Sequence, residues 1–488
     1  MRHIVGTKVK TTTQRVVPLY IGLLAALLSL VLVTAEPSAT SGEAKGSYEV
    51  SYVAGGRDAA GRFMGGTELR SLVAHEGRVY AGIGYWEDKP GPEGPQGAAI
   101  LVLDGPNAAW RVEQVFDERL PSGRGRDLAV SALSSVSFAT GSTGEILSKP
   151  VPMLVASTWD LSGATRAFSR DEASGSWIPT TLYRGSVAPD FVPQIRSFGV
   201  HRDRRTQIDY VFAGNSPRGI FAGVYDPTAV GRIRWAVTPE LDLAANSGAG
   251  FSGLEGRVRV NAFAECGNVL YAAVGQQIYQ RIDGSEPKWR LVYTNPRPGH
   301  SETGLRGLTT IADPSGGGEV LLAAVEGTAA RILRVDPKTG HEATDLELRD
   351  VLADAWRMPV GYVIAAYNEM TKLSRREGEE LLIGLEAFIP RRAQIPKGHI
   401  SVDVGYGRLE GGAWYLVRHK DGRYDLHQIK ANLPTIGEAL VATRSIVRSP
   451  FRGDGDGLYF AGYDANKAPA HNTAWVVRAN AAMLFAAR

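Results

Sequence analysis

Apolar and polar residues alternate along most of the chain beyond residue 45, and turn residues interrupt the alternation at short intervals. The stretch Glu68–Gly84 is typical, because it alternates, turns at Glu76-Gly77 and alternates again. Similar hairpins lie at Arg259–Gly275, Gly304–Gly327 and Thr443–Asp464. Period-two alternation bounded by turn residues predicts β-strands joined by tight turns. The pattern therefore predicts an all-β fold.

The hairpins belong to a longer repeat of four strands. The first strand is rich in small residues, and a turn leads to a second strand that ends in glycine or an aromatic residue. A third strand follows, and then an outer strand that often opens with tryptophan. Leu101–Phe116 and Tyr279–Thr294 match best, because each contains Asp-Gly, four residues and Trp-Arg. The outer-strand tryptophans are Trp110, Trp177, Trp235 and Trp289. Repeats of about 40–50 residues with four strands each are typical of β-propeller blades.

The predicted fold is a single β-propeller with seven four-stranded blades. The repeats lie near residues 68–117, 128–183, 194–240, 258–294, 305–348, 361–430 and 443–479. The last repeat shows three strands, and the lone strand Gly46–Val53 is predicted to supply its outer strand and close the ring. Irregular second and sixth repeats leave six or eight blades open. A short packing helix is predicted within Arg349–Tyr362, with Val351, Leu352, Ala355 and Met358 on one face.

The N-terminal segment has the pattern of an export signal. Basic residues at positions 2, 8, 10 and 15 precede an apolar run from Val16 to Val33, and small residues at 33–35 suit signal-peptidase cleavage. The length of the run also leaves an uncleaved anchor open. We predict a signal peptide or anchor at 1–35, a linker at 36–45 and the propeller at 46–488. The mature protein is predicted to be secreted or periplasmic, without a membrane span.

Composition excludes some classes of function. The 54 Lys and Arg residues nearly balance the 51 Asp and Glu residues, and without a dominant basic run nucleic acid is not a predicted partner. The single cysteine, Cys266, has no partner within the chain, so no disulfide framework exists. No phosphate loop, zinc spacing or nucleophile elbow occurs. No cofactor is predicted; Asp454 and Asp456 could hold a structural calcium, although a full ligand set is not visible. A monomer is predicted.

The four-strand repeat resembles the β-propeller superfamily, in particular the sialidase-like and other carbohydrate-active propellers of exported bacterial proteins. The stretch Ser169–Trp177 is similar to the Asp-box of that group. The resemblance covers nearly all of the predicted mature chain and implies a propeller fold. It selects no single activity, because propellers include hydrolases, lyases, oxidoreductases and binding scaffolds.

An arginine recurs at the start of the predicted innermost strand. Each is followed by a small and then an apolar residue, and the four are Arg70, Arg196, Arg306 and Arg444. Innermost strands line the channel of a propeller, so four guanidinium groups would face one rim. Arginine binds carboxylate or sulfate with two parallel hydrogen bonds and keeps its charge. Two interpretations stay open: the arginines bind an anionic ligand, or each pairs with an acid of a neighbouring blade.

The loops between the second and third strands share this rim and combine aromatic residues with carboxylates, which suits sugar recognition. The predicted binding residues there are Tyr85, Trp86, Trp159 and Asp464, and the predicted catalytic residues are Glu87, Asp88, Asp160, His471 and Tyr463. His75 and His201 are predicted to lie away from this rim. The sequence thus predicts a protein that binds an acidic oligo- or polysaccharide and could cleave it as a hydrolase or lyase. The alternative is a non-catalytic propeller that binds protein or cell-wall partners.

Overall fold

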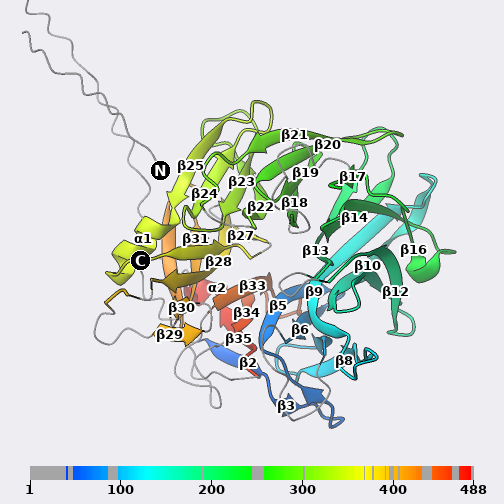
Figure 1. Cartoon of the computed structure of the whole chain (residues 1–488), viewed down its shortest axis with the longest axis horizontal. Helices are drawn as coiled ribbons and strands as arrows, with labels where there is room; N and C mark the ends of the chain where they lie inside the picture. Colours follow the sequence, from blue (N-terminus) through cyan, green and yellow to red (C-terminus); the bar gives the residue numbers. More distant parts are fainter. Residues whose placement is uncertain are drawn as a thin grey trace, which may run out of the picture. The chain divides into compact units, whose positions relative to one another are not determined.

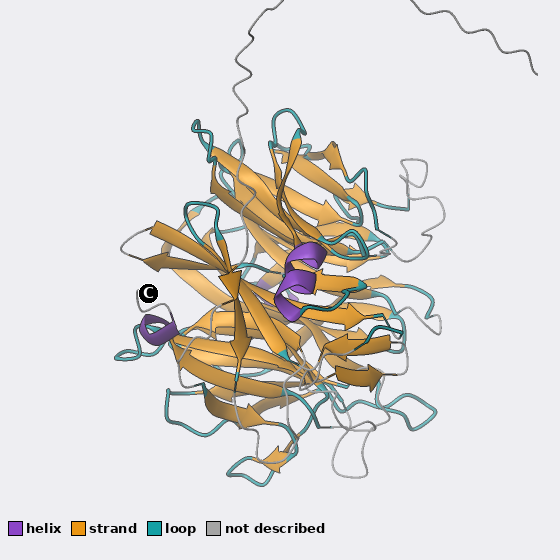
Figure 2. Ribbon diagram, turned by 90° about the vertical axis from the view of Figure 1, so that its left-hand side faces the viewer, coloured by secondary structure: helices purple, strands orange, loops and turns teal. Residues whose placement is uncertain are grey.

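A computed structural model gives the fold of the chain. It describes residues 40–41, 48–85, 97–187, 192–244, 258–299, 303–367, 369–375, 378–390, 392–394, 401–404, 407–410, 412–430, 442–463 and 472–484. Residues 37–488 form one compact unit. Strands make up most of its described part (Figure 2). In these ranges no helix is both long and apolar enough to cross a bilayer.

A sheet of four antiparallel strands in chain order is the recurring element. One consists of β18 (Val260–Cys266), β19 (Val269–Val274), β20 (Gln277–Ile282) and β21 (Lys288–Thr294). The next consists of β22 (Leu305–Ala312), β23 (Glu319–Val325), β24 (Arg331–Val335) and β25 (Glu342–Glu347). A third is formed by β13 (Gln194–Arg202), β14 (Asp209–Ser216), β15 (Gly219–Tyr225) and β16 (Ile233–Trp235), with β17 (Leu241–Asp242) also pairing with β15.

An eight-stranded sheet contains two such sets. The first is β5 (Glu68–His75), β6 (Arg78–Gly84), β7 (Ala99–Leu103) and β8 (Arg111–Val115). The second is β9 (Asp127–Thr140), β10 (Ile146–Asp160), β11 (Ala164–Arg170) and β12 (Trp177–Arg184). The residue pair Gly84 and Ala129 joins β6 to β9. A Cβ atom on Gly84 would lie 2.2 Å from Cα of Ala129, so this close approach requires glycine.

The second eight-stranded sheet has an interrupted inner strand. Its strands are β26 (Tyr362–Ala365), β27 (Thr371–Arg375), β28 (Gly378–Ile389), β29 (Ser401–Val404), β30 (Gly407–Glu410), β31 (Ala413–Arg418), β32 (Tyr424–Ile429) and β1 (Thr40–Ser41). Both β26 and β27 pair with β28, so they are two parts of one inner strand separated by residues 366–370. The predicted helix is confirmed as α1 (Leu348–Trp356), but its buried residues are Leu348, Leu352 and Trp356.

The N-terminal strand completes the last sheet, as predicted. The sheet order is β2 (Glu49–Val53), β35 (Trp475–Asn480), β34 (Gly457–Tyr463) and β33 (Ala442–Arg448). β2 pairs antiparallel with β35, with Val53 opposite Trp475. Tyr52 is buried in the core between this sheet and the first set. A hairpin of β3 (Gly56–Arg57) and β4 (Phe63–Met64) follows β2, and the short helix α2 (Ala481–Leu484) follows β35.

The inner strands pack side by side in a closed circuit (Figure 1). β5 packs against β9 and β33, β9 against β13, β13 against β18, β18 against β22, β22 against β26, and β28 against β33. The all-β, propeller-like architecture predicted from the sequence is therefore present. The count of seven separate blades stays a prediction, because hydrogen bonding between β6 and β9 merges two sets into one sheet.

The outer-strand tryptophans follow the predicted repeat with one exception. Trp177 opens β12, Trp289 lies at the start of β21, and Trp110 immediately precedes β8. Trp235 instead ends β16, opposite Gly223, because the 3-10 turn Val230–Arg232 occupies the approach to that strand.

Candidate functional site

The inner strands share a β-bulge near their first residues. In β5 the pairing with β6 passes from Leu69 directly to Ser71, which leaves Arg70 as the extra residue. Corresponding shifts occur in five other inner strands. They leave out Ser131 in β9, Arg196 in β13, Asn261 in β18, Arg306 with Gly307 in β22, and Arg444 in β33. A bulge leaves one residue unpaired and re-aims its side chain. The arginines recur because they occupy this bulge.

In the sheet of β26–β28 the bulge is larger. Pairing with β28 stops at Ala365 and resumes at Thr371, and residues 366–370 lie between. Ala366 has a φ of 51°, in the left-handed region, where the chain leaves the strand. Tyr367 therefore occupies the place that an arginine holds in β5, β13, β22 and β33.

The four bulge arginines surround Tyr367. The guanidinium carbons of Arg444, Arg306 and Arg196 lie 4.2, 4.4 and 5.9 Å from the centre of its ring. Nη2 of Arg196 donates a hydrogen bond to the Tyr367 hydroxyl at 3.4 Å. Each of the five side chains is at most 6 % exposed. We refer to Arg70, Arg196, Arg306, Arg444 and Tyr367 as the arginine cluster.

Three buried glutamates hold the guanidinium groups in place. Glu68 accepts a hydrogen bond from Nε of Arg70 at 2.6 Å and forms an ion pair with Arg444 at 2.8 Å. Glu386 pairs with Arg444 at 2.5 Å and accepts a hydrogen bond from the Tyr463 hydroxyl at 2.7 Å. Arg306 pairs in the same way with Glu326, which also accepts a hydrogen bond from Tyr362. Three of the four arginines thus pair with acids in the described part of the chain, but only Arg444 pairs with acids of neighbouring sheets, as one of the two sequence interpretations required.

These ion pairs do not remove the positive potential of the cluster. Burial alone would raise the pKa of Tyr367, yet Arg70, Arg196 and Arg306 lower it to about 8. Burial together with the charge of Arg259 lowers the pKa of Arg196. A phenol whose pKa falls despite complete burial reports a strongly positive environment. The cluster therefore favours an added negative charge.

Donor groups and space are both present for such a charge. Nη1 of Arg306 is buried and has no hydrogen-bond partner within the described ranges. Arg70 is bound to Glu68 through Nε. A central cavity of about 280 Å³ adjoins the cluster, and Arg70, Arg196 and Arg444 line it. Together these groups form a candidate anion site.

The structure brings two predicted aromatic residues to the cluster. Tyr463 is buried, and Arg444 lies over its ring at 5.1 Å. Trp159 is half-buried, and Arg70 lies over its ring at 5.0 Å. Tyr85, in contrast, is 3 % exposed, and burial raises its pKa to about 12. Tyr85 is thus a packed side chain rather than an open stacking surface.

The predicted carboxylates do not gather here within the described part of the chain. Asp160 is 1 % exposed, pairs with Arg166 at 2.6 Å and accepts a hydrogen bond from the amide of Ser162, so it stabilises the turn after β10. Five further predicted residues lie outside the described residues: Trp86, Glu87, Asp88, Asp464 and His471. Their predicted roles stay predictions.

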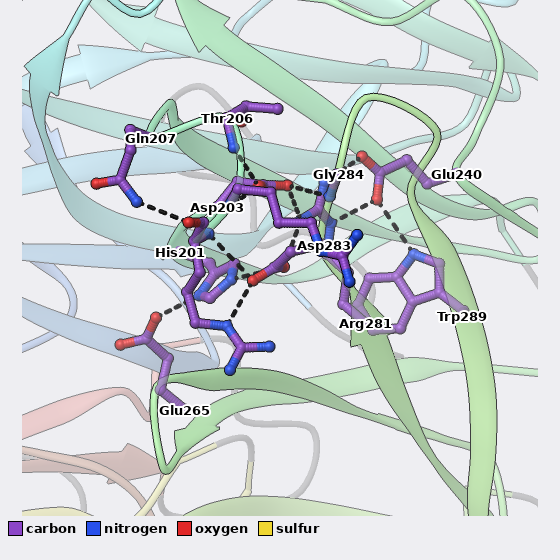
Figure 3. A network of polar contacts seen from close by, with 12 residues as sticks. His201, Asp203, Thr206, Gln207, Glu240, Glu265, Arg281, Asp283, Gly284 and Trp289 are labelled. Carbon is purple, nitrogen blue, oxygen red and sulfur yellow. Dashed lines mark hydrogen bonds and ion pairs between the residues drawn. The ribbon is translucent and has the colours of Figure 1, made fainter.

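A second polar network lies toward the other end of the inner strands (Figure 3). His201 is five residues beyond Arg196 on β13, about 16 Å along an extended strand. It contacts Glu265 at 2.5 Å and Asp283 at 3.0 Å. The fully buried Arg281 contacts Asp283 and Asp203, both at 2.8 Å, and these contacts join the sheets of β13 and β18. This network is internally paired, and His201 and His75 lie at the far ends of β13 and β5, where both are buried.

No group of three or more potential metal-ligating side chains occurs among the described residues. Asp454, one half of the suggested calcium pair, forms an ion pair with Arg478. This carboxylate is therefore already paired with an arginine.

The chain resembles the β-propellers at the level of the fold. No family model and no curated protein matches it. Among solved structures it is similar to the sialidase of Trypanosoma rangeli, with 11 % identity, a TM-score of 0.38 and coverage of 90 % of this chain. A complex of that sialidase with 2-keto-3-deoxy-D-glycero-D-galacto-2,3-difluoro-nononic acid also has 11 % identity and a TM-score of 0.38. The chain spans 60 % and 58 % of the lengths of these two structures.

Sequence reasoning missed the residue at the centre of the cluster. Tyr367 follows the small-residue run that ends at Ala366, at the point where four of the other repeats have arginine. The glutamate partners also had a signal, because Glu326 and Glu386 both stand near the end of the second strand of their repeats. An aligned comparison of strand ends would have placed these acids opposite the arginines.

Proposed function

We propose that the protein is an exported seven-bladed propeller whose arginine cluster binds the carboxylate or sulfate group of an acidic saccharide. The lowered pKa of Tyr367 in a fully buried setting carries the proposal, because it requires a net positive field at that point. A bound anion would take up this field. Repulsion among buried like charges would fall in the complex, and this gain contributes to the affinity.

Three features support the ligand class and the blade count. Arg70 and Arg306 are held by their glutamates through Nε, which leaves Nη atoms for a two-pronged contact with an anion. Trp159 next to the cluster is half-buried and provides an aromatic side chain of the kind that stacks on sugar rings. The bulge or its enlarged form recurs at seven inner-strand positions in the described ranges, and this recurrence supports seven blades.

Elimination is the cleavage reaction that Tyr367 favours. With a pKa of about 8, its phenol can lose a proton near neutral pH. A phenolate beside an arginine-bound carboxylate could remove the proton from the carbon next to that group, and the arginines would stabilise the resulting negative charge. The bond between the neighbouring carbon and its glycosidic oxygen then breaks, a carbon–carbon double bond forms, and the departing oxygen takes the proton back from the Tyr367 phenol. The alternative is a non-catalytic propeller in which the same loops bind protein or cell-wall partners.

Calorimetric titration with glucuronate and with neutral glucose tests the binding proposal. We expect glucuronate to bind and glucose not to bind. Arg196→Gln should weaken glucuronate binding by about 1.5–3 kcal/mol, the cost of one charge-assisted hydrogen bond. Its folding stability should stay the same or rise, because like charges surround the buried guanidinium of Arg196. Arg297→Gln is the matched control, since Arg297 forms an exposed ion pair with Glu347.

Equal affinity for glucuronate and glucose, or unchanged binding by Arg196→Gln, would refute the proposed anion site. Incubation with a polyuronate then separates the reactions. Elimination produces an unsaturated end that absorbs in the ultraviolet, hydrolysis produces a new reducing end without that absorbance, and a binding scaffold produces neither.

A further inference from the structure

The central cavity has an acidic side chain that the arginine cluster does not use. Glu369 lies in the interruption between β26 and β27, two residues beyond Tyr367, and lines the same cavity as Arg70, Arg196 and Arg444. It forms no ion pair with an arginine within the described ranges. A carboxylate in a cavity with three guanidinium groups would ordinarily be recruited by one of them. Glu369 is thus left for another partner.

A hydrogen-bond chain fixes the orientation of this carboxylate. The amide of Leu72 on β5 donates to Oγ of Ser445 on β33 at 3.0 Å, and Ser445 donates to Oε1 of Glu369 at 2.7 Å. The chain connects three neighbouring inner strands. Oε2 of Glu369 makes no hydrogen bond in the described part of the protein. The Glu369 side chain is exposed, and we assign this exposure to the cavity that it lines. Protein atoms on its other sides exclude water from the carboxylate and raise its pKa.

The rest of the cavity wall complements a sugar ring. Phe198 and Phe263 line it and are half-buried, so part of each aromatic side chain remains accessible. Aromatic faces pack against the C–H face of a sugar, whereas carboxylates accept hydrogen bonds from its hydroxyls. A volume of about 280 Å³ is at the lower end for a small-molecule site, which suits one ring.

We infer that Glu369 is a specificity-determining residue that accepts a hydrogen bond from a hydroxyl of a sugar acid whose acidic group is held by the arginine cluster. This inference rests on the proposed anion site and adds the second contact point. The cavity then distinguishes a hydroxylated ring acid from an unhydroxylated ring acid of the same charge. The arginine cluster binds the acidic group, and Glu369 accepts the hydrogen bond from the hydroxyl.

The affinities of two ligands for the unmodified protein and for Glu369→Ala test the inference. The probes are glucuronate and cyclohexanecarboxylate, which share a six-membered ring and a carboxylate but differ in their hydroxyls. The unmodified full chain should bind glucuronate more tightly. Glu369→Ala should lose about 10- to 100-fold in glucuronate affinity, the range for a hydrogen bond to a charged group, and should bind cyclohexanecarboxylate as before. Glu347→Ala, at an exposed ion pair on the outer strand β25, is the control and should change neither affinity.

The outcomes distinguish failure of the proposed role of Glu369 from failure of the proposed anion site. If both probes bind and Glu369→Ala weakens them equally or not at all, the role of Glu369 is refuted while the anion site stands. If neither probe binds the unmodified chain, the anion site itself fails and the inference fails with it. Thermal melting of Glu369→Ala checks folding, and Glu369→Gln, which keeps the shape and one acceptor oxygen, should retain part of the preference for glucuronate if the first variant is unstable.

Discussion

Ionisation of Tyr367 gives a direct measurement of the field in the arginine cluster. A fall of its pKa from 10.0 to about 8 corresponds to roughly 3 kcal/mol in favour of the phenolate. The arginines must supply this amount and the cost of burial. At an effective dielectric constant of about 20, a unit charge about 5 Å away contributes about 3 kcal/mol. Two or more of the surrounding guanidinium groups therefore suffice.

Ultraviolet absorbance of tyrosinate during a pH titration is the assay. We expect one tyrosinate to form with a midpoint near pH 8, well before Tyr48, Tyr85 and Tyr279, whose pKa values burial raises to about 12. Tyr367→Phe should abolish this early step. Arg196→Gln, which removes the donor to the Tyr367 hydroxyl, should move the midpoint up by about one to two pH units.

Two results would refute this reasoning. The first is a titration in which no tyrosinate forms below pH 9 in the unmodified protein. The second is an early step that persists in Tyr367→Phe, because it would then belong to another tyrosine. Tyr225→Phe is a suitable control, since Tyr225 lies on β15 away from the cluster and should leave the early step unchanged.

The remaining predictions concern stability. Arg444→Gln should reduce the free energy of unfolding by about 3–5 kcal/mol in denaturant titrations, because it leaves two buried glutamates without their shared partner; a loss below about 1 kcal/mol would contradict the ion-pair geometry. His419 has a pKa raised from 6.5 to about 9 by Asp425 and then Glu380, so it stabilises the fold by about 3 kcal/mol below pH 6.5 and loses this contribution as the pH rises through 9. His419→Gln should therefore destabilise the protein at pH 6 and hardly at pH 10; equal losses at both would disprove the assignment.

Local patterns in the sequence predict the strands, because alternation records which face of each strand is buried. They also predict the closing strand, since an unpaired apolar segment ahead of a three-stranded repeat has one open edge to occupy. β2 pairs with β35 at that edge. The arginine triplets are visible in the sequence for the same reason, because each bulge has a fixed place relative to the alternation.

The residues of the arginine cluster meet through contacts that the alternation of apolar and polar residues does not encode. Tyr367 reaches the cluster because the pairing with β28 is interrupted between β26 and β27, and such an interruption resembles an ordinary loop in a sequence. Glu386 meets Arg444 across two sheets and a separation of 58 residues. Asp160 pairs with Arg166, six residues further along on the next strand, and this pairing buries a carboxylate that the sequence places in a loop.

The pairing of β2 with β35 has a consequence for the order in which the protein folds. Val53 and Trp475 face one another although 422 positions separate them in the chain. β2 must remain unpaired until β35 has been synthesised, because β35 is its partner among the described strands. Closing so long a loop is slow and favours late, concerted completion of the ring. A nascent chain in which β35 has not yet been synthesised would therefore remain an open arc with two unsatisfied edges, accessible to chaperones and proteases until that strand emerges.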